Sequence, residues 1–289
     1  MHDQATNLRQ QLDSVKQHPL AKTIAFVSGK GGVGKSNIAL NFAIELQKRH
    51  KSVLLIDLDI GMGNIEVMLG LQAQYSIVDL LESHYRLQDI IQNGPNGLSF
   101  IAGGSGLLDI FSMNEQDFSF FYEEYSQAVR QFDYILFDMG AGINEWSVSF
   151  ILAADECVVV TTPEPTAITD AYSMIKHLLQ RNEKLPMSII MNRVSEVRKG
   201  EKTAQQFQHI VEKFLNYNIV IRGVIPYDTQ VTKAVIKQTP YLLLNERSRA
   251  SQAIKRLVDL YTSTSDSVEQ TANNPLSFID KLKTFLRKR

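Results

Sequence analysis

Short apolar runs alternate with amphipathic stretches along most of this chain. Seven runs have the length and composition of buried strands, and they lie near residues 23–28, 52–57, 98–101, 133–137, 156–162, 187–192 and 219–225. Helical spacing of apolar positions fills several intervals between them, notably Glu115–Arg130, Thr166–Leu179 and Lys202–Phe214. Strands that alternate with helices pair in parallel through right-handed crossovers and carry helices on both faces. The pattern predicts one three-layer α/β domain over residues 20–262, with a mostly parallel sheet.

The chain changes character twice beyond that domain. Residues 263–274 are polar and nearly free of large apolar side chains, which is typical of a linker. Residues 275–289 then place apolar side chains on one face of a predicted helix: Phe278, Ile279, Leu282, Phe285 and Leu286. The same stretch has one acidic residue, Asp280, and five basic ones: Lys281, Lys283, Arg287, Lys288 and Arg289. The pattern favours an amphipathic helix on an anionic membrane surface. A helix packed on its own domain or on a protein partner has similar periodicity.

Composition narrows the function classes. The chain has 289 residues, 44% of them hydrophobic, which is enough for a substantial core, and its net charge of −1 gives no general attraction to nucleic acid. Its single cysteine, Cys157, lies in an apolar run, so it forms no disulfide within the chain and cannot supply an iron–sulfur cluster. The sequence shows no secretory signal and no apolar stretch that approaches roughly twenty residues. Together with the absence of a disulfide, these features lead us to expect a protein of the reducing cytoplasm. The six histidines show no metal-ligand spacing.

The strongest local signal is the glycine-rich sequence GKGGVGKS at residues 29–36, which fits the phosphate-loop pattern G-x-x-x-x-G-K-[ST]. A buried-type strand precedes it and a helical pattern follows it, so backbone N–H groups and a helix N-terminus converge on phosphate oxygens. We expect Lys35 to contact the β- and γ-phosphates and the Ser36 hydroxyl to bind Mg²⁺. The predicted nucleotide-binding residues of this loop are Gly29, Lys30, Gly31, Gly32, Val33, Gly34, Lys35, Ser36 and Asn37.

Carboxylates follow two other predicted strands. Asp57 and Asp59 end the run that begins at Ser52, at the strand end where open α/β sheets bind ligands. The structural alternative for either residue is a helix cap or turn. Asp138 ends a third apolar run and precedes Gly140 and Gly142, which is the Walker B arrangement that supports Mg²⁺. Later in the chain Asn192 ends a strand, where its amide offers an adenine base both a donor and an acceptor.

Lys30 adds a second lysine to the loop. With it the motif resembles K-G-G-x-G-K-[ST] of the deviant Walker A ATPases, the MinD/ParA family. The resemblance implies a P-loop NTPase fold and a homodimer formed with ATP, in which Lys30 reaches phosphates bound by the partner copy. It also implies that Asp59 positions or activates the attacking water and that Asp57 supports Mg²⁺ through water. Ser36-Asn37 departs from the two threonines common in the family, which leaves a contact of Asn37 with the α-phosphate in doubt.

The same resemblance extends to a later segment of the domain and to the N-terminus of the chain. The segment Ile225-Pro-Tyr-Asp228 is similar to the family's I-P-x-D sequence, which implies that Pro226, Tyr227 and Asp228 line the base pocket. The first residues resemble the D-Q-A-x-x-L-R motif of the FlhG-type members, in which an N-terminal segment, here residues 1–19, stimulates the GTPase FlhF. That implies an activating role for Gln4, with Leu8 and Arg9 anchoring the segment. A frayed polar terminus is the structural alternative.

Together these features predict an FlhG-type (FleN, YlxH) ATPase that helps to set flagellar number and placement. The resemblance implies ATP, ADP and Mg²⁺ as cofactors, and FlhF, flagellar switch-ring proteins and anionic lipid as partners. We expect a cytoplasmic protein that attaches to the inner face of the membrane in its ATP state, with no specific nucleic acid. The alternatives are a MinD division-site ATPase, a ParA-like DNA-partitioning ATPase, which would bind DNA with steep salt dependence, and an ATP-dependent ligase on the same fold.

Overall fold

A computed structural model describes residues 20–61, 63–104, 115–142, 145–268 and 278–287. The predicted N-terminal activator segment, with Gln4, Leu8 and Arg9, lies outside the described residues.

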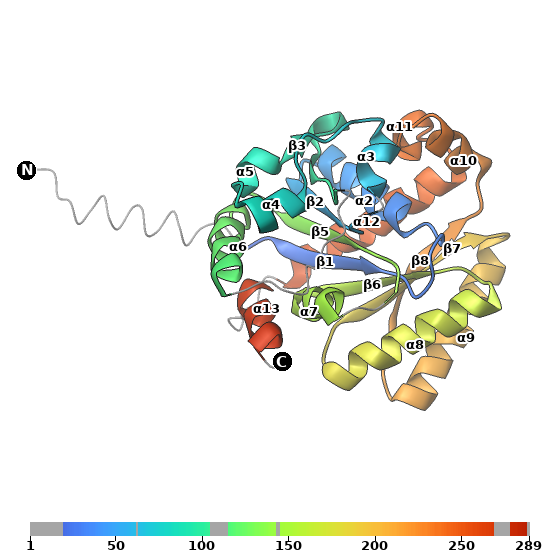
Figure 1. Cartoon of the computed structure of the whole chain (residues 1–289). Helices are drawn as coiled ribbons and strands as arrows, with labels where there is room; N and C mark the ends of the chain where they lie inside the picture. The colour runs from blue at the N-terminus through green and yellow to red at the C-terminus, as the bar shows by residue number, and fades with distance from the viewer. Residues whose placement is uncertain (1–19, 62, 105–114, 143–144, 269–277, 288–289) are drawn as a thin grey trace, which may run out of the picture.

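A central sheet of eight strands runs through the described part of the chain (Figure 1). The strands are β1 (Lys22–Val27), β2 (Val53–Leu58), β3 (Gln92–Asn93), β4 (Ser99–Ile101), β5 (Tyr134–Met139), β6 (Glu156–Thr161), β7 (Met187–Val194) and β8 (Val220–Pro226). Their spatial order is β3-β4-β2-β5-β1-β6-β7-β8, and each pair is parallel except β3 with β4. All seven runs predicted as strands are strands. The two-residue β3 was not predicted, because it is too short to show a periodicity.

Helices cover both faces of this sheet. The helices are α2 (Lys35–Lys48), α3 (Asn64–Leu69), α4 (Ile77–Ser83), α5 (Leu87–Ile90), α6 (Glu115–Ala128), α7 (Glu145–Ala153), α8 (Pro165–Arg181), α9 (Val197–Leu215), α10 (Thr229–Ile236), α11 (Tyr241–Leu244), α12 (Arg249–Val268) and α13 (Phe278–Arg287). One buried cluster lies beneath α2, α10, α11 and α12, and the other beneath α4, α6, α7, α8, α9 and α13. The three-layer α/β prediction is confirmed.

Burial on both faces explains why the strands read as continuous apolar runs. Every residue of β2, β5 and β6 is buried, so apolar side chains are favoured on both sides of these strands. The exceptions are informative. Glu156 begins β6, and Asp57 and Asp138 lie near the ends of β2 and β5, where they face each other in the register of the two strands. Buried charges require partners, so these two positions point to a functional site.

Helix α12 continues further than the sequence indicated. Residues 263–268, predicted as the start of the linker, belong to this helix. Two hydroxyls near the start of this stretch are satisfied within the helix, since the Thr262 hydroxyl donates to the Val258 carbonyl at 3.1 Å and the Ser263 hydroxyl to the Asp259 carbonyl at 2.8 Å. Polar composition alone therefore did not mark the helix end.

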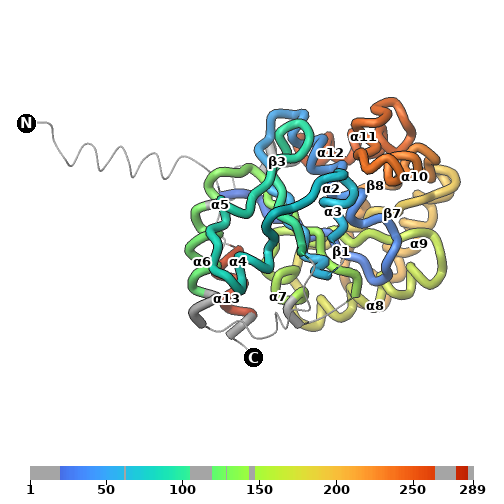
Figure 2. The backbone as a smooth tube through the Cα atoms, turned by 45° about the horizontal axis from the view of Figure 1, so that its top comes forward, coloured from blue at the N-terminus to red at the C-terminus, as the bar shows by residue number. Residues whose placement is uncertain are grey.

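The C-terminal helix α13 is docked on its own domain, beside α6 and α7 (Figures 1 and 2). Phe278, Ile279 and Leu282, predicted to face a membrane, are buried here, and Phe285 is partly buried against the same core. The ring of Phe278 stacks on Phe137 with a centroid separation of 4.9 Å. This is the packing alternative that the periodicity left open. The side chains of Leu286 and Arg287 lie outside the described residues. Within the described part, no helix has the length and apolar character needed to cross a membrane.

Candidate nucleotide site

The glycine-rich loop joins the end of β1 to the start of α2, as the sequence predicted. Two of its glycines are required by close approach. A Cβ at Gly29 would lie 2.4 Å from the backbone carbonyl of Asp170 in α8, and one at Gly34 would lie 2.5 Å from the Asn192 amide nitrogen. Gly34 also has a φ of +94°, in the left-handed region that favours glycine. The loop is therefore held by the protein itself in a conformation open to phosphates.

Lys35 points into the described site rather than to solvent. Its ammonium lies 2.5 Å from Oδ1 of Asp138 and 3.2 Å from the Ser36 hydroxyl, and its side chain is buried. Lys35 and Ser36 were predicted from the glycine-rich loop and Asp138 from a distant strand to act on phosphate and Mg²⁺, and the fold brings the two segments together. Asp138 here takes the position of an anionic partner of Lys35, so bound phosphates would compete with this carboxylate for the lysine.

The buried carboxyls of Asp57 and Asp138 disfavour their own ionisation. Burial, and after it the neighbouring charge of Asp138, raise the pKa of Asp57 to about 7, although backbone N–H donors and the Lys35 ammonium oppose that shift. Burial also raises the pKa of Asp138, although the Lys35 ammonium opposes that shift. A positive charge between or beside two carboxyls on adjacent strands stabilises their ionised forms. This electrostatic environment suits a cation.

The residues present fit Mg²⁺ bound jointly with a nucleotide. Oδ2 of Asp138 is buried and has no hydrogen-bond partner among the described residues, and the Ser36 hydroxyl lies beside the same lysine. The described chain contains no cluster of three or more His, Cys, Asp or Glu side chains suited to a metal. Mg²⁺ is usually held in phosphoryl-transfer sites by one or two protein oxygens, with phosphates and water completing its shell. The donor set at Ser36 and Asp138 has that character.

Asp57 has a structural task in addition. Its Oδ1 accepts the Asp59 N–H at 2.9 Å, and its Oδ2 accepts the N–H groups of Asn64 at 3.0 Å and Ile65 at 3.2 Å. It therefore anchors the first turn of α3, which is the capping alternative raised from the sequence. Its role in supporting Mg²⁺ stays a prediction.

Asp59 lies beside Gly140, which belongs to the segment that follows Asp138. Its Oδ2 accepts a hydrogen bond from the Asn64 amide at 2.8 Å, and a Cβ at Gly140 would lie 3.1 Å from its Oδ1. Glycine at position 140 thus lets the segment after Asp138 approach this carboxylate. The predicted role of Asp59 with the attacking water stays a prediction, and Asn64, which sequence reasoning missed, is its positioning partner.

Lys30 lies apart from the cluster around Lys35. Its ammonium donates to the Thr166 hydroxyl at 2.9 Å and lies 3.5 Å from a Glu164 carboxylate oxygen, and its side chain is 41% exposed. Both partners stand at the start of α8, and neither was singled out from the sequence. The lysine that distinguishes the loop therefore lies at the surface. Its contacts with the exposed Thr166 and Glu164 side chains are solvent-screened and weak.

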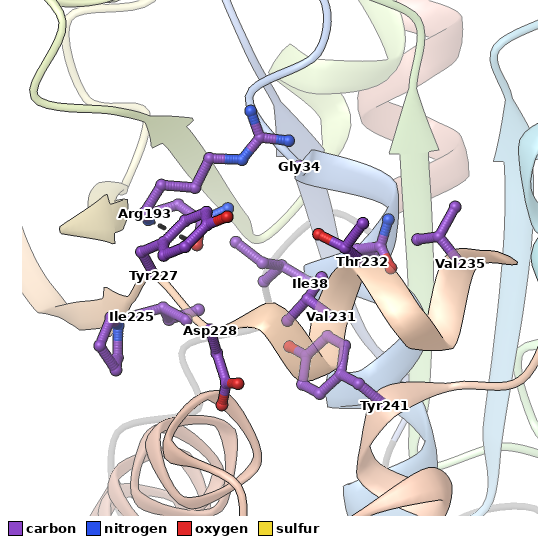
Figure 3. Close-up of a pocket in the computed structure, with 13 residues that line it drawn as sticks. Gly34, Ile38, Arg193, Ile225, Tyr227, Asp228, Val231, Thr232, Val235 and Tyr241 are labelled. Carbon is purple, nitrogen blue, oxygen red and sulfur yellow. Dashed lines mark hydrogen bonds between the residues drawn. The ribbon is translucent and has the colours of Figure 1, made fainter. Parts of the chain in front are cut away.

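A cavity of about 380 Å³ opens beside the loop and is lined by Gly34, Asn37, Ile38, Asn192, Arg193, Ile225, Pro226, Tyr227, Asp228, Val231, Thr232, Val235 and Tyr241 (Figure 3). It contains the predicted base-pocket residues at the ends of β7 and β8 and the predicted loop residues Gly34 and Asn37. Ile38 of α2 and the side chains of α10 and α11 were not assigned from the sequence. Val231 and Val235 follow Asp228 at helical spacing, which could have identified them. Tyr241 carries no local signal, because only the chain path brings α11 to this cavity.

Two of the predicted pocket residues are largely committed to protein contacts. The Asn192 amide donates to the Val33 carbonyl at 2.8 Å and accepts from the Arg193 N–H at 2.9 Å. Asp228 caps α10 by accepting from the Gln230 N–H at 2.9 Å, and its second oxygen accepts from the Ala250 N–H at 3.0 Å. Burial opposes the ionisation of Asp228, but these N–H donors outweigh it and lower its pKa. Asp228 therefore lines the pocket while its carboxylate fixes α10 and α12.

Known proteins resemble this chain over most of its length. Residues 24–241 match the CobQ/CobB/MinD/ParA nucleotide-binding domain family. The antiactivator FleN of Pseudomonas aeruginosa is 34% identical over 238 residues, covering 82% of this chain and 85% of the relative. The flagellum site-determining protein YlxH of Helicobacter pylori is 33% identical over 270 residues, covering 92% and 90%. The solved MinD cell division protein of Aquifex aeolicus has 30% identity and a TM-score of 0.67 over 84% of this chain and 97% of its own.

Proposed function

The chain belongs to the MinD/ParA family of P-loop ATPases, and from this premise we propose that it regulates the number and placement of flagella. The similarity to YlxH, a flagellum site-determining protein, and to the antiactivator FleN supports the FlhG-type branch within the family. The N-terminal D-Q-A-x-x-L-R sequence at residues 3–9 supports the same branch and argues against MinD itself. The near-neutral net charge of −1 does not favour a DNA-partitioning role.

The observation that carries the mechanism is the position of Lys30. Its ammonium contacts Thr166 and Glu164 instead of the Lys35–Asp138 cluster of its own chain. We infer that ATP pairs two copies face to face and that Lys30 of each copy leaves α8 to reach the phosphates held by the other. A cation supplied in trans stabilises the charge that develops in phosphoryl transfer, in the manner of an arginine finger.

Within each copy the other residues divide the work. Lys35 would hold the phosphates in place of its contact with Asp138, and Ser36 and Asp138 would hold Mg²⁺, which would neutralise phosphate charge when bound. Asp59, fixed by Asn64, orients the attacking water and can accept its proton. Gly140 lets the following segment close on this carboxylate and withdraw after the γ-phosphate leaves.

Membrane attachment requires α13 to leave the core. Its apolar face is buried, and each large apolar side chain contributes about 1.5–3 kcal/mol when fully buried, so the docked helix presents little to lipid. Phe278 stacks on Phe137, the residue before Asp138, and α13 packs on α7, which follows the segment after Asp138. We infer that nucleotide-dependent movement of the segment after Asp138 weakens the packing of α13 on the domain. Two released helices on one dimer then bind anionic lipid far better than one.

Asparagine at position 155 should raise lipid binding without ATP. Oδ1 of Asp155 lies 2.9 Å from the Lys281 ammonium, which ties α13 to the domain. Loss of a partly exposed ion pair costs about 0.5–1 kcal/mol, so the released fraction should rise about threefold. Flotation of the ADP-bound protein with phosphatidylglycerol vesicles measures this change.

Asp133→Asn is the matched control. Asp133 accepts hydrogen bonds from the N–H and hydroxyl of Ser52, as Asp155 does from Thr23, but no contact joins it to α13 in the described chain. The two substitutions change net charge equally. If both variants float alike, undocking of α13 does not limit membrane attachment.

The N-terminal segment supplies the proposed contact with the GTPase. A peptide of residues 1–20 should raise GTP turnover by FlhF, because a glutamine amide can orient an attacking water and an arginine can stabilise transferred charge. A Gln4→Ala peptide should lose most of that stimulation, at least tenfold, while a Gln11→Ala peptide keeps it. Stimulation that is equal for all three peptides would rule out the activating role of Gln4. Switch-ring proteins are the remaining proposed partners.

A further inference from the structure

Tyr241 carries a hydroxyl that the protein leaves without a partner. The side chain is 2% exposed, and the hydroxyl has no hydrogen-bond partner among the described residues. Its ring lines the cavity beside the phosphate loop (Figure 3). We propose that the Tyr241 hydroxyl hydrogen-bonds the adenine base and is a specificity-determining residue for the nucleotide. This inference rests on the nucleotide occupying that cavity.

The position of the ring is fixed relative to the phosphate loop. Asn41, in α2, accepts the Leu242 N–H at 2.9 Å with its Oδ1 and donates to the Asn37 carbonyl at 2.8 Å. The Tyr241 carbonyl accepts from the Ser251 hydroxyl of α12 at 3.3 Å. Because α2 begins at Lys35, these contacts tie the tyrosine to the helix that holds the phosphates. A ring anchored in this way can read a base whose phosphates are already placed.

The surrounding side chains leave this task to Tyr241. Asn192 spends its carbonyl and one donor on the backbone of Arg193 and Val33, and both oxygens of Asp228 accept N–H groups. Ile38 and Val231 offer apolar surface for the faces of a base, and in Figure 3 the Tyr241 hydroxyl is directed toward Val231. Among the described residues, the buried polar groups of this wall with unused hydrogen-bonding capacity are therefore the Tyr241 hydroxyl and the second N–H of the Asn192 amide.

The hydroxyl is suited to a purine edge. Burial raises the pKa of Tyr241 above its ordinary value, so the group stays protonated and remains a donor at physiological pH. Adenine presents ring nitrogens that accept and an amino group that donates, and a phenol can serve either. A buried hydroxyl without a partner costs free energy in the empty protein, and a bound base would remove that cost. The base thus gains affinity from a group that weakens the unliganded fold.

Tyr241→Phe tests the proposal because it removes only the hydroxyl. The affinity for ADP, measured by titration calorimetry with Mg²⁺, should fall about tenfold. The affinity for inorganic tripolyphosphate, which occupies the phosphate loop without a base, should stay unchanged. The melting temperature of the unliganded variant should equal or exceed that of the parent. Lower ADP affinity with unchanged or higher stability distinguishes base recognition from a packing role.

Tyr125→Phe is the matched control. Tyr125 is also buried with an unpartnered hydroxyl, but its ring lies against Phe278 of α13, remote from the nucleotide cavity. It should leave both affinities unchanged. The inference is overturned if Tyr241→Phe binds ADP as the parent does, or if it loses tripolyphosphate and ADP affinity equally. Failure of the parent to bind ADP would overturn the nucleotide assignment of the cavity, whereas the two former outcomes overturn only the role of Tyr241.

Discussion

Alanine at position 30 should abolish ATP-dependent pairing of the chain and lower ATP turnover by about 1000-fold, the scale of a transition-state cation supplied in trans. The reason is geometric. Lys30 is exposed and contacts Thr166 and Glu164, so its loss removes no buried contact and leaves the fold and the Lys35–Asp138 cluster intact. The substitution removes the positive charge that we propose acts on the phosphates bound by a second copy.

The experiment sizes the protein by light scattering after gel filtration, with ADP and with ATP. An Asp59→Ala background, in which hydrolysis is expected to be slow, should be dimeric with ATP, and adding Lys30→Ala should return it to a monomer. Lys184→Ala, an exposed lysine before β7, at the other end of the sheet, serves as the control for lost surface charge. ADP affinity should remain near the parental value. A Lys30→Ala protein that pairs with ATP and hydrolyses it at the parental rate would falsify the trans mechanism.

Alanine at position 156 should lower the free energy of unfolding by about 3–5 kcal/mol, the usual cost of leaving a buried ion pair without one partner. Oε1 of Glu156 accepts hydrogen bonds from the hydroxyls of Ser188 and Tyr261, both at 2.7 Å, and from Arg222 at 3.0 Å. Lys22 lies 3.5 Å from its other oxygen. One carboxylate thus connects β1, β6, β7, β8 and α12 beneath the sheet.

The contribution of Glu156 should also depend on pH. Burial opposes its ionisation, but Lys22, Arg222 and the two hydroxyls outweigh burial and lower its pKa below the ordinary 4.5. A carboxyl whose folded pKa is depressed stabilises the fold above its unfolded pKa and loses that effect as pH falls through the folded value. The difference between parent and Glu156→Ala in urea should therefore be full at pH 7 and shrink below pH 4.5.

Glu246→Ala is the control for this stability test. Glu246 also pairs with two lysines, Lys48 and Lys255, but its side chain is 49% exposed, so its removal should cost less than about 1 kcal/mol. Equal destabilisation by the two substitutions would show that burial of Glu156 is not what makes its network strong.

Local chemistry predicted much of the nucleotide site. Gly34 has a positive φ, Lys35 and Ser36 follow β1, and Asp57 and Asp138 lie near the carboxyl ends of β2 and β5, where open α/β sheets bind ligands. Each of these signals can be recognised within a few residues of the sequence. The sequence did not identify the side chains that contact the residues of the site. Thr166 contacts Lys30, and Tyr241 lines the cavity beside the phosphate loop, only because crossovers bring distant segments to one edge of the sheet.

The C-terminal helix shows where sequence reasoning ended. Apolar side chains on one face of residues 278–286 stabilise a helix against lipid or against protein equally well, since both remove the same area from water. In the structure Phe278 finds Phe137, Tyr125 and Phe150, and Lys281 finds Asp155. Periodicity shows that one face of the helix is apolar, but it does not show whether lipid or protein covers that face.

The amino-acid sequence by itself determined the strands, the three-layer order and the phosphate loop, because burial on both sheet faces and glycine backbone freedom act within a few residues. Tertiary structure alone decided that Asp57 caps α3, that Asp228 anchors α12, that Glu156 joins five elements and that α13 is docked. The Asp57 cap joins residues seven positions apart, whereas the other outcomes depend on contacts between segments that are 22 or more residues apart. Such contacts follow from chain path and packing, which no local pattern encodes.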